Sequence, residues 1–537
     1  MREVFDTVIM VAGGLGLFLF GMKIMSSGLE IVAGNRLQHI LHRATANKIL
    51  AVIVGIVATI GINSSTAVTI MTVSFVNSGL MNLKQAIGII MGANVGTTFS
   101  AQLVAFRIDA VAPLFIFFGT IMYLFFKKRS VKNIGYIILG FGVLFFGVTV
   151  MGTPLRALAD EPSFNAMLAS FQNPFLALLT GFIFTAIVQS SSATMGLLVT
   201  MHLAGVPISF ETSAFIILGT NIGTSITTLI ASIPANRESK RAASFHILFD
   251  IIGSTVFGLL IFFVPSILHW FQATWSDSAR QVAMFHTLYN FATLFLLLPF
   301  TEQLVKLVSS FVPNGDSDEE KEIKFLDWNL IDRPQFALTA AHSELLRMAD
   351  LATENVRLAV QCFLQKDEEL LEKVIKQEAR VNRLEKEIVL YLADISQKSM
   401  GGRMTIRHAG LLHAANDIER VSDHARNIAY TAEKVIEEKV SFTEDFVKEL
   451  MEMYVLVGDI LEAATNSARD NDPKTVATVR ELEEKIDAKE LALKDSNLKR
   501  MLNGDMEAGL VFFDIISNFE RIGDHATNLL NLPQGRL

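Results

Sequence analysis

The first 311 residues hold two copies of one apolar unit, and each copy carries two short polar motifs at the same relative place. The first copy reads TIGINSSTA at 59–67 and GANVGTT at 92–98, and the second reads TAIVQSSSA at 185–193 and GTNIGTS at 219–225. The motif pairs are offset by 126 and 127 residues, so the unit is a tandem duplication. Polar groups in an apolar environment are costly unless they are partnered or used. The duplication therefore predicts one small polar site built between two half-proteins.

Charge divides the chain into an apolar part and an acidic part. Residues 1–311 contain 17 Lys and Arg and 11 Asp and Glu, whereas residues 312–537 contain 29 and 43. Between Lys48 and Arg107 the only charged residue is Lys84, and such runs exceed the roughly 18–20 apolar residues that span a bilayer. We therefore predict an all-α protein with a membrane domain at 1–311, a linker at 312–333 and a soluble helical domain at 334–537.

Each copy contains a hydrophobic segment that is too short to cross a membrane twice. The arm at 49–62 has 14 residues, the length expected of a re-entrant segment. Non-helical backbone is tolerated at membrane depth only where protein or a water-filled cavity covers it. We therefore predict re-entrant helical hairpins at 49–80 and 174–205, with the Ser-rich turns at their tips.

The remaining segments predict membrane helices in matching order in both copies. The copies span about 9–128 and 132–266, and GLGLFLFG at 14–21 matches GFGVLFFG at 140–147. In each copy, the second polar motif predicts a helix that is interrupted at its glycines. The expected helices are 9–33, 83–106 and 110–127 in the first copy, 132–152, 209–232 and 241–266 in the second, and an additional helix at 279–304.

An odd number of crossings in each copy predicts that the second copy is inverted in the membrane. Under the positive-inside rule, equivalent loops should then carry opposite charge bias. The loop between the copies is strongly basic and fits the cytoplasmic side (Lys127, Lys128, Arg129 and Lys132). We predict a multi-pass protein of the plasma (inner) membrane, with the N-terminus outside and the C-terminal domain in the cytoplasm.

A break in a helix exposes backbone groups that suit small ions. The N–H groups at the start of the second half carry a partial positive charge and suit an anion, whereas the carbonyls that end the first half suit Na⁺. No Lys or Arg lies in the four motifs, so a divalent oxyanion would be held by hydroxyls, amides and co-bound cations. The candidate substrate and sodium ligands are Asn63, Ser64, Ser65, Thr66, Asn94, Thr97, Thr98, Gln189, Ser190, Ser191, Ser192, Asn221, Thr224 and Ser225.

Two other interpretations of these hydroxyls compete with a binding site. Ser and Thr in membrane helices also bond back to the carbonyl four residues earlier or allow close helix packing. The repetition of four motifs in register favours a site over this alternative. An enzyme with a serine nucleophile is disfavoured, because no G-x-S-x-G motif and no His or acidic partner lies near either turn. We therefore predict no catalytic residues.

Three ionisable residues lie in the predicted membrane helices of the second copy and beyond it. His246 and Asp250 lie four residues apart on one helix face, and His286 lies on the next helix. Ionisable groups inside a membrane usually have a function. These residues form a proton or cation accessory site, or they only pair with one another or with Arg241; the sequence leaves both alternatives open.

The QSSS turn at 189–192, the NSST turn at 63–66 and the paired G-[AT]-N-[VI]-G-T motifs resemble the type II sodium–phosphate cotransporter family over about residues 9–305. The resemblance implies Na⁺-coupled movement of inorganic phosphate through inverted repeats, with both Ser-rich turns lining the substrate site. Asn63 and Thr66 depart from the QSSS pattern, and Asn63 shortens one amide arm. The alternatives are a transporter of another oxyanion, such as sulfate or arsenate, and a membrane-bound phosphate sensor without net transport.

The soluble part contains a second duplication. DIERVSDHARN at 417–427 matches NFERIGDHATN at 518–528, an offset of 101 residues, and EARVN at 378–382 more weakly matches EEKID at 483–487. Helical periodicity runs through the whole part. The expected helices are 336–365, 368–398, 404–438, 443–468, 472–502 and 505–531.

Two pairs of acidic residues in this duplication predict a metal site. Glu419 and Asp423 lie four residues apart and share a helix face, as do Glu520 and Asp524. Such faces can gather carboxylates in a bundle, although an ordinary charged face has the same spacing. The pattern resembles PhoU, a regulator of phosphate uptake built from two three-helix repeats, which implies a divalent or iron-type metal at these carboxylates. Asn518 replaces the acid that corresponds to Asp417, so we expect the second cluster to be weaker or differently loaded.

The expected partners follow from these resemblances and from charge. They are inorganic phosphate, sodium ions and the lipid bilayer, with a homodimer and a cytoplasmic regulatory protein as further candidates. The acidic balance of the soluble part disfavours nucleic acid. The resemblance to PhoU implies that the soluble domain regulates flux through the membrane domain, by gating the transporter or by recruiting a kinase-type partner. The alternative is that it only stabilises a dimer.

Overall fold

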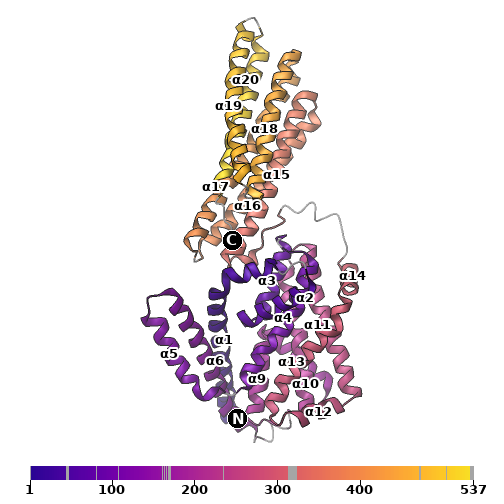
Figure 1. Cartoon of the computed structure of the whole chain (residues 1–537). Coiled ribbons are helices and arrows are strands. Elements are labelled where there is room, and N and C mark those ends of the chain that lie inside the picture. The colour runs from indigo at the N-terminus through magenta and orange to yellow at the C-terminus, as the bar shows by residue number, and fades with distance from the viewer. Residues whose placement is uncertain are drawn as a thin grey trace. The chain divides into compact units, whose positions relative to one another are not determined.

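The computed structural model describes residues 2–43, 47–79, 81–106, 108–159, 161, 164, 166, 168, 171–233, 235–312, 323–398, 400–470, 473–502 and 505–532. These residues form α-helices and short 3-10 helices, and none of them lies in a strand. The chain divides into two compact units, Met1–Asp318 and Glu319–Leu537 (Figure 1). The predicted all-α class is confirmed for the described residues.

The first unit contains both predicted hairpins. α2 (Lys48–Ile62) and α3 (Ser65–Asn77) form one, and α8 (Pro174–Val188) and α9 (Ser191–Leu203) form the other. In each hairpin the arms have 15 and 13 residues. At a rise of 1.5 Å per residue, the longer arm reaches only about 22 Å, which is less than the roughly 30 Å of a hydrocarbon core. The arms therefore turn back inside the unit.

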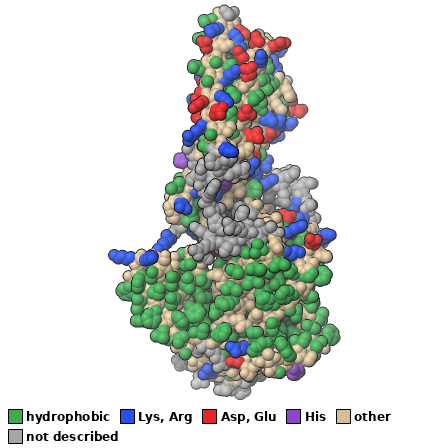
Figure 2. Space-filling model, in the orientation of Figure 1, with side chains coloured by type: hydrophobic (Ala, Val, Ile, Leu, Met, Phe, Trp, Pro, Cys, Tyr) green, Lys and Arg blue, Asp and Glu red, His purple; other side chains and the backbone are tan. Residues whose placement is uncertain are grey.

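Six helical stretches among the described residues are long and apolar enough to cross a membrane. They lie in α1 (Arg2–Arg43), α4 (Leu83–Ala105), α6 (Arg129–Ala159), α10 (Phe210–Ser232), α11 (Arg237–Phe263), and α13 (Ser278–Leu297) with α14 (Thr301–Phe311). α5 (Ala112–Phe125) has only 14 residues, and the short α12 (Ser266–Thr274) was not predicted. Figure 2 shows hydrophobic side chains over most of the visible face of this unit, as lipid contact requires.

The helices that carry the second polar motifs are continuous, which corrects the predicted interruption at their glycines. α4 and α10 are each helical over 23 residues. Their glycines serve close packing instead. A Cβ at Gly92 would lie 2.1 Å from the carbonyl oxygen of Val52, and one at Gly219 would lie 1.9 Å from that of Leu178. In each copy, the first hairpin arm thus packs directly against the backbone of the second-motif helix.

The first helices of the two copies, α1 and α6, pack antiparallel along facing glycines. Gly14 lies against Gly147, and Gly21 lies against Gly140. Gly14 and Gly140 are equivalent positions in the duplication, as are Gly21 and Gly147. The repeat therefore maps the Gly14–Gly147 contact onto the Gly140–Gly21 contact. Equivalent helices that run in opposite directions are the geometry of an inverted repeat, as the sequence predicted.

The second unit is a bundle of two three-helix sets. The sets are α15 (Pro334–Gln365), α16 (Glu368–Ser396) and α17 (Gly402–Glu438), then α18 (Glu444–Asp470), α19 (Pro473–Leu502) and α20 (Met506–Asn528). The equivalent helices α17 and α20 pack against each other and join the sets. The described end of the predicted linker also belongs to this unit, because the Tyr391 hydroxyl donates to the carbonyl oxygen of Asp327 at 2.7 Å.

The α1–α6 contact generates a test of the inverted repeat. A Cβ at Gly21 would lie 2.2 Å from the backbone nitrogen of Leu144, whereas one at Gly16 on the same helix would meet nothing within 4 Å. We expect Gly21→Ala to destabilise the protein by about 1–3 kcal/mol, because the two backbones must move apart. Gly16→Ala should be neutral or stabilising. Thermal unfolding in detergent measures both, and equal midpoints would contradict the packing.

Candidate functional site

The tips of both hairpins have the same backbone geometry. Asn63 ends α2 and Gln189 ends α8 in the left-handed conformation, with φ of 55° and 58°. The next residues, Ser64 and Ser190, are the N-caps of α3 and α9. Non-glycine residues seldom adopt a left-handed backbone and keep it only where the surroundings fix it. Its occurrence at equivalent places marks both tips as constrained turns.

Each tip offers donors that the hairpin itself does not use. Ser64 accepts from the N–H of Ala67 and Ser190 from the N–H of Ala193, both at 3.2 Å, so each cap satisfies the third N–H of its helix. The N–H groups before that position have no partner within the helix. Ser65 and Ser191 begin the helices and are 4% and 3% exposed. Within the described part of the chain, their hydroxyls make no hydrogen bond.

Hydrogen bonds connect the two tips through α4. Ser192 Oγ donates to Ser100 Oγ at 3.2 Å, and Ser100 Oγ donates to Asn63 Oδ1 at 2.6 Å. The packing of the hairpins produces this path, because α9 lies against α4 of the first copy and α3 lies against α10 and α11. Two turns that are 126 residues apart in the sequence thus share one polar region. The tips differ in one respect, since the Asn63 side chain is buried and that of Gln189 is exposed.

The hydroxyls of the second motifs bond back to their own helices. The four donate to backbone carbonyl oxygens at 2.8–3.1 Å: Thr97 to Ala93, Thr98 to Val95, Thr224 to Thr220 and Ser225 to Ile222. The alternative of back-bonding therefore applies at these positions. Each hydroxyl uses its hydrogen in this way and keeps its oxygen as an acceptor, which suits a cation more than an oxyanion.

The asparagines of the second motifs make matching contacts in the two copies. Asn94 Nδ2 donates to Asp250 Oδ1 of α11 at 2.6 Å, and Asn221 Nδ2 donates to Asn290 Oδ1 of α13 at 2.8 Å. All four side chains are buried. The same contact is therefore made once to a carboxylate and once to a neutral amide.

His246 links this carboxylate to the first hairpin. Its Nε2 lies 3.1 Å from Asn94 Oδ1 and 3.4 Å from Asp250 Oδ2, and its Nδ1 lies 3.1 Å from Thr228 Oγ1. Thr228 Oγ1 in turn lies 3.1 Å from Thr69 Oγ1 of α3. Asp250 Oδ2 has no hydrogen-bond partner among the described residues. His246 and Asp250 therefore lie within ion-pair distance, as the sequence suggested, but no hydrogen bond joins them in the described structure.

His286 and Arg241 stand apart from this pair. Both ring nitrogens of His286 are buried without a hydrogen-bond partner among the described residues. Arg241 donates to Glu238 and to the carbonyl oxygen of Val312. Neither residue contacts Asp250 through a hydrogen bond or ion pair in the described structure, so the proposed pairing with them is not formed.

Sequence reasoning missed three residues of this region. Asn290 follows His286 at the spacing that separates Asp250 from His246, and this repeated H-x-x-x-[DN] pattern was a usable signal. Ser100 and Thr228 carried no signal of their own. They join the region only because helices of one copy pack against hairpin arms of the other.

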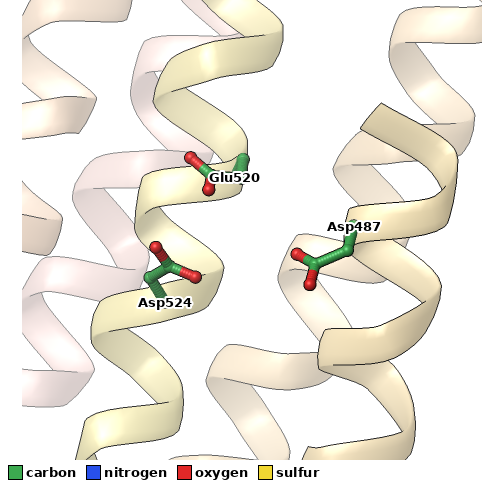
Figure 3. Close-up of side chains that lie close together, drawn as sticks. All are labelled: Asp487, Glu520 and Asp524. Atoms are coloured by element: carbon green, nitrogen blue, oxygen red, sulfur yellow. The ribbon is translucent and has the colours of Figure 1, made fainter. Parts of the chain in front are cut away.

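In the second unit, the E-x-x-x-D motifs lie in two carboxylate clusters. Asp487 of α19 faces Glu520 and Asp524 of α20, and one oxygen of each lies within 4.8 Å of the others (Figure 3). Asp487 was not predicted as a ligand, although it belongs to the weaker sequence match at 483–487. Oxygen-only donors of this kind fit a hard divalent cation.

The pKa values of carboxyl groups are raised in both clusters. Burial and the neighbouring Asp487 raise the pKa of Asp524, and burial and Asp524 raise the pKa of Glu520. Burial followed by Asp487 and Asp524 also raises the pKa of Glu483. In the other cluster, burial and Asp423 raise the pKa of Glu419. Burial is the larger cause of each raised pKa, and the neighbouring carboxylates add a repulsion that a bound cation would offset.

Asp417 and Asn518 lie at the contact between α17 and α20. His525 Nδ1 donates to Asp417 Oδ1 at 2.8 Å, and His424 Nδ1 donates to Asn518 Oδ1 at 2.8 Å. The two rings stack with centroids 5.8 Å apart. The replacement of an acid by Asn518 therefore changes this contact between the sets. Asn518 therefore bonds outside the second cluster, and the expected metal loading of that cluster stays a prediction.

Comparison with known proteins matches both units. The family model described as Na⁺/Pi-cotransporter matches residues 17–153 and 146–302, and the PhoU domain model matches 345–432 and 450–532. The "Putative inorganic phosphate export protein YjbB" of Salmonella typhimurium is 28% identical over 454 residues, which cover 83% of this chain and 82% of that protein. The "Sodium-dependent phosphate transport protein 2B" of Homo sapiens is 33% identical over 100 residues, which cover 18% of this chain and 14% of that protein. The crystal structure of PhoU from Pseudomonas aeruginosa aligns with 22% identity and a TM-score of 0.35, over 36% of this chain and 92% of that one.

The twin contacts of Asn94 and Asn221 allow a test of Asp250. Asp250→Asn copies Asn290, so we expect it to retain the thermal midpoint of the full-length protein within a few degrees. Asp250→Leu leaves the buried Asn94 amide without its acceptor and should cost about 1–3 kcal/mol. Thermal unfolding in detergent compares the two variants. An equal loss in both would show that the amide cannot replace the carboxylate at this contact.

Proposed function

Because the chain belongs to the Na⁺/Pi-cotransporter family, we propose that it moves inorganic phosphate across the membrane in a process coupled to Na⁺, and that both ions bind between the two hairpin tips. The observation that carries this proposal is the hydrogen-bonded path from Ser192 through Ser100 to Asn63. It sets two helix N-termini with free donors beside one polar region. One hairpin alone would supply only one of the two N-termini.

Phosphate fits the donors of the tips. The first N–H groups of α3 and α9 and the hydroxyls of Ser65 and Ser191 are directed donors, and helix N-termini bind phosphate groups through N–H groups and the helix dipole. Ser64 and Ser190 hold these N-termini in place as caps. Thr66, Gln189 and Ser192 complete the proposed substrate contacts. This arrangement places donors from both copies around a tetrahedral anion.

Sodium ions fit the acceptors that surround the tips. Thr97, Thr98, Thr224 and Ser225 direct their hydrogens to helix carbonyls and keep oxygen lone pairs. The amide oxygens of Asn63, Asn94 and Asn221 add hard oxygen donors. No arginine or lysine lies in the motifs to neutralise phosphate, so bound Na⁺ would offset the substrate charge in a low-dielectric site. This dependence is the physical basis of the proposed coupling.

Transport requires the site to open to each side in turn. The second arm of each hairpin packs against helices of the other copy, so movement of one copy past the other changes the access to both tips together. The basic loop between the copies supports an orientation with the N-terminus outside and the soluble half in the cytoplasm. In this orientation, the soluble half meets the cytoplasmic phosphate pool.

The soluble half supplies the regulation in this proposal. It matches the PhoU domain model over both three-helix sets. A divalent or iron-type metal would be held by the carboxylates of its E-x-x-x-D motifs. A bound metal would offset their mutual repulsion and fix α19 against α20. Regulation of flux then depends on the folded, metal-bound bundle.

The substrate site is tested by removing one free hydroxyl. We expect Ser191→Ala to lower Na⁺-driven uptake of labelled phosphate into proteoliposomes by at least about tenfold, because a buried donor to a charged ligand is lost. Ser310→Ala is the matched control, since its hydroxyl is exposed and bonds back to Leu307. Equal flux in the two variants would remove Ser191 from the site.

The same vesicles test the coupling and the direction of transport. Phosphate accumulation should follow an inward Na⁺ gradient, and phosphate loss should follow an outward one. Sulfate and arsenate competition identifies the anion. Phosphate binding without flux under either gradient would support the sensor alternative instead.

Regulation is tested by truncation at the boundary between the units. A chain that ends after Asp318 keeps the whole first unit. We expect it to transport phosphate without the response of flux to metal chelation that we expect of the full-length protein. Identical flux and identical response in both proteins would contradict a regulatory role of the soluble half.

A further inference from the structure

The two carboxylate clusters of the soluble half lie at equivalent positions of its duplication but differ in one cation. The first cluster contains Glu378 of α16 with Glu419 and Asp423 of α17, and the second contains Asp487 of α19 with Glu520 and Asp524 of α20. Glu419 and Asp423 correspond to Glu520 and Asp524 by the offset of 101 residues. Similar sites would therefore be expected in both sets.

An arginine fills the first cluster. Arg426 Nη1 donates to Glu378 Oε1 at 2.5 Å, and Arg426 Nη2 lies 3.2 Å from Asp423 Oδ1. The guanidinium thus bridges α16 and α17, the two helices from which ligands would come. Arg420 adds a second cation at 3.6 Å from Asp423 and 3.7 Å from Glu419. Charge-assisted bonds of this kind satisfy the carboxylate oxygens that a metal would need.

The second cluster has Arg521 at the position of Arg420 but lacks the bridge that Arg426 makes. Thr527 stands at the position that corresponds to Arg426, and its hydroxyl donates to the carbonyl oxygen of its own helix residue Gly523 at 3.1 Å. The second set also has one more acid here, because Glu483 corresponds to Glu378 and Asp487 corresponds to Asn382. One substitution removes a competing cation, and the other adds a ligand. Both changes favour a metal at the second cluster alone.

We infer that the soluble half holds metal at Asp487, Glu520 and Asp524 only, and that the Arg426 guanidinium takes the place of metal in the first cluster. The inference rests on the proposed metal binding of the PhoU-like half and specifies where that binding occurs. The guanidinium is covalently part of the chain and does not dissociate as a metal ion does. The link that it makes between α16 and α17 is therefore independent of metal. The second set is held only when a divalent cation is present. Metal availability would then change one end of the bundle and leave the other unchanged.

The duplication supplies matched variants for a test. Arg426→Thr with Asn382→Asp gives the first cluster the residues of the second, and Thr527→Arg with Asp487→Asn does the reverse. Full-length protein is stripped with chelator in detergent and titrated with Mn²⁺. Bound Mn²⁺ is counted by electron paramagnetic resonance. Hydrogen exchange of peptides from α16–α17 and from α19–α20 locates the binding.

In the wild type, we expect Mn²⁺ to slow exchange in α19–α20 and not in α16–α17. The Thr527→Arg/Asp487→Asn variant should bind Mn²⁺ at least about tenfold more weakly. The Arg426→Thr/Asn382→Asp variant should gain Mn²⁺ and new protection in α16–α17. This gain of binding tests the inference even if substitutions in the second cluster disturb its folding, because the variant leaves that cluster unchanged.

Three results would overturn the inference. They are equal Mn²⁺ protection of both sets in the wild type, no new site in the Arg426→Thr/Asn382→Asp variant, and no Mn²⁺ binding by any variant. Phosphate flux measured on the same preparations separates the last result from a failure of the transport proposal. Intact Na⁺-driven flux without Mn²⁺ binding would reject only the metal site.

Discussion

Backbone that turns back inside a membrane domain leaves N–H and C=O groups that only protein, ions or buried water can satisfy. Both hairpins meet this constraint in the same way. A serine cap satisfies one N–H, and the second arm is buried against the opposite copy. The remaining donors face a shared polar region. In the proposed function a phosphate with its sodium ions satisfies them, so the proposed binding site rests on the same feature that makes the hairpins costly.

The antiparallel contact of α1 and α6 makes this sharing possible. Facing glycines bring the two backbones into direct contact, and this fixes the two copies in opposite directions. Each hairpin then lies across helices of the other copy. The polar groups divide by chemistry within that frame. Donors lie at the tips, and hydroxyls with committed hydrogens lie on α4 and α10.

Both duplications keep a geometry while changing one charge. Asp250 and Asn290 accept the same bond from equivalent asparagines, and Asp417 and Asn518 accept the same bond from equivalent histidines. Asp417 and Asn518 are equivalent positions of their duplication, whereas Asp250 belongs to the second copy and Asn290 to the additional helix α13. The hydrogen bond is thus preserved in each pair, and the charge of its acceptor is not.

The sequence alone determined the helical class, the duplications, the hairpins and the polar tips. These follow from local composition, because apolar length sets the number of spans and a short apolar arm around NSST or QSSS must turn back. It misjudged the glycines of GANVGT and GTNIGT, since a glycine that breaks a helix and one that admits a neighbouring backbone look alike in sequence. Only the tertiary structure decided that Ser100 joins the tips, that Asn94 meets Asp250, and that Arg426 fills one carboxylate cluster. Those contacts join residues far apart in the chain, and their geometry depends on how whole helices pack.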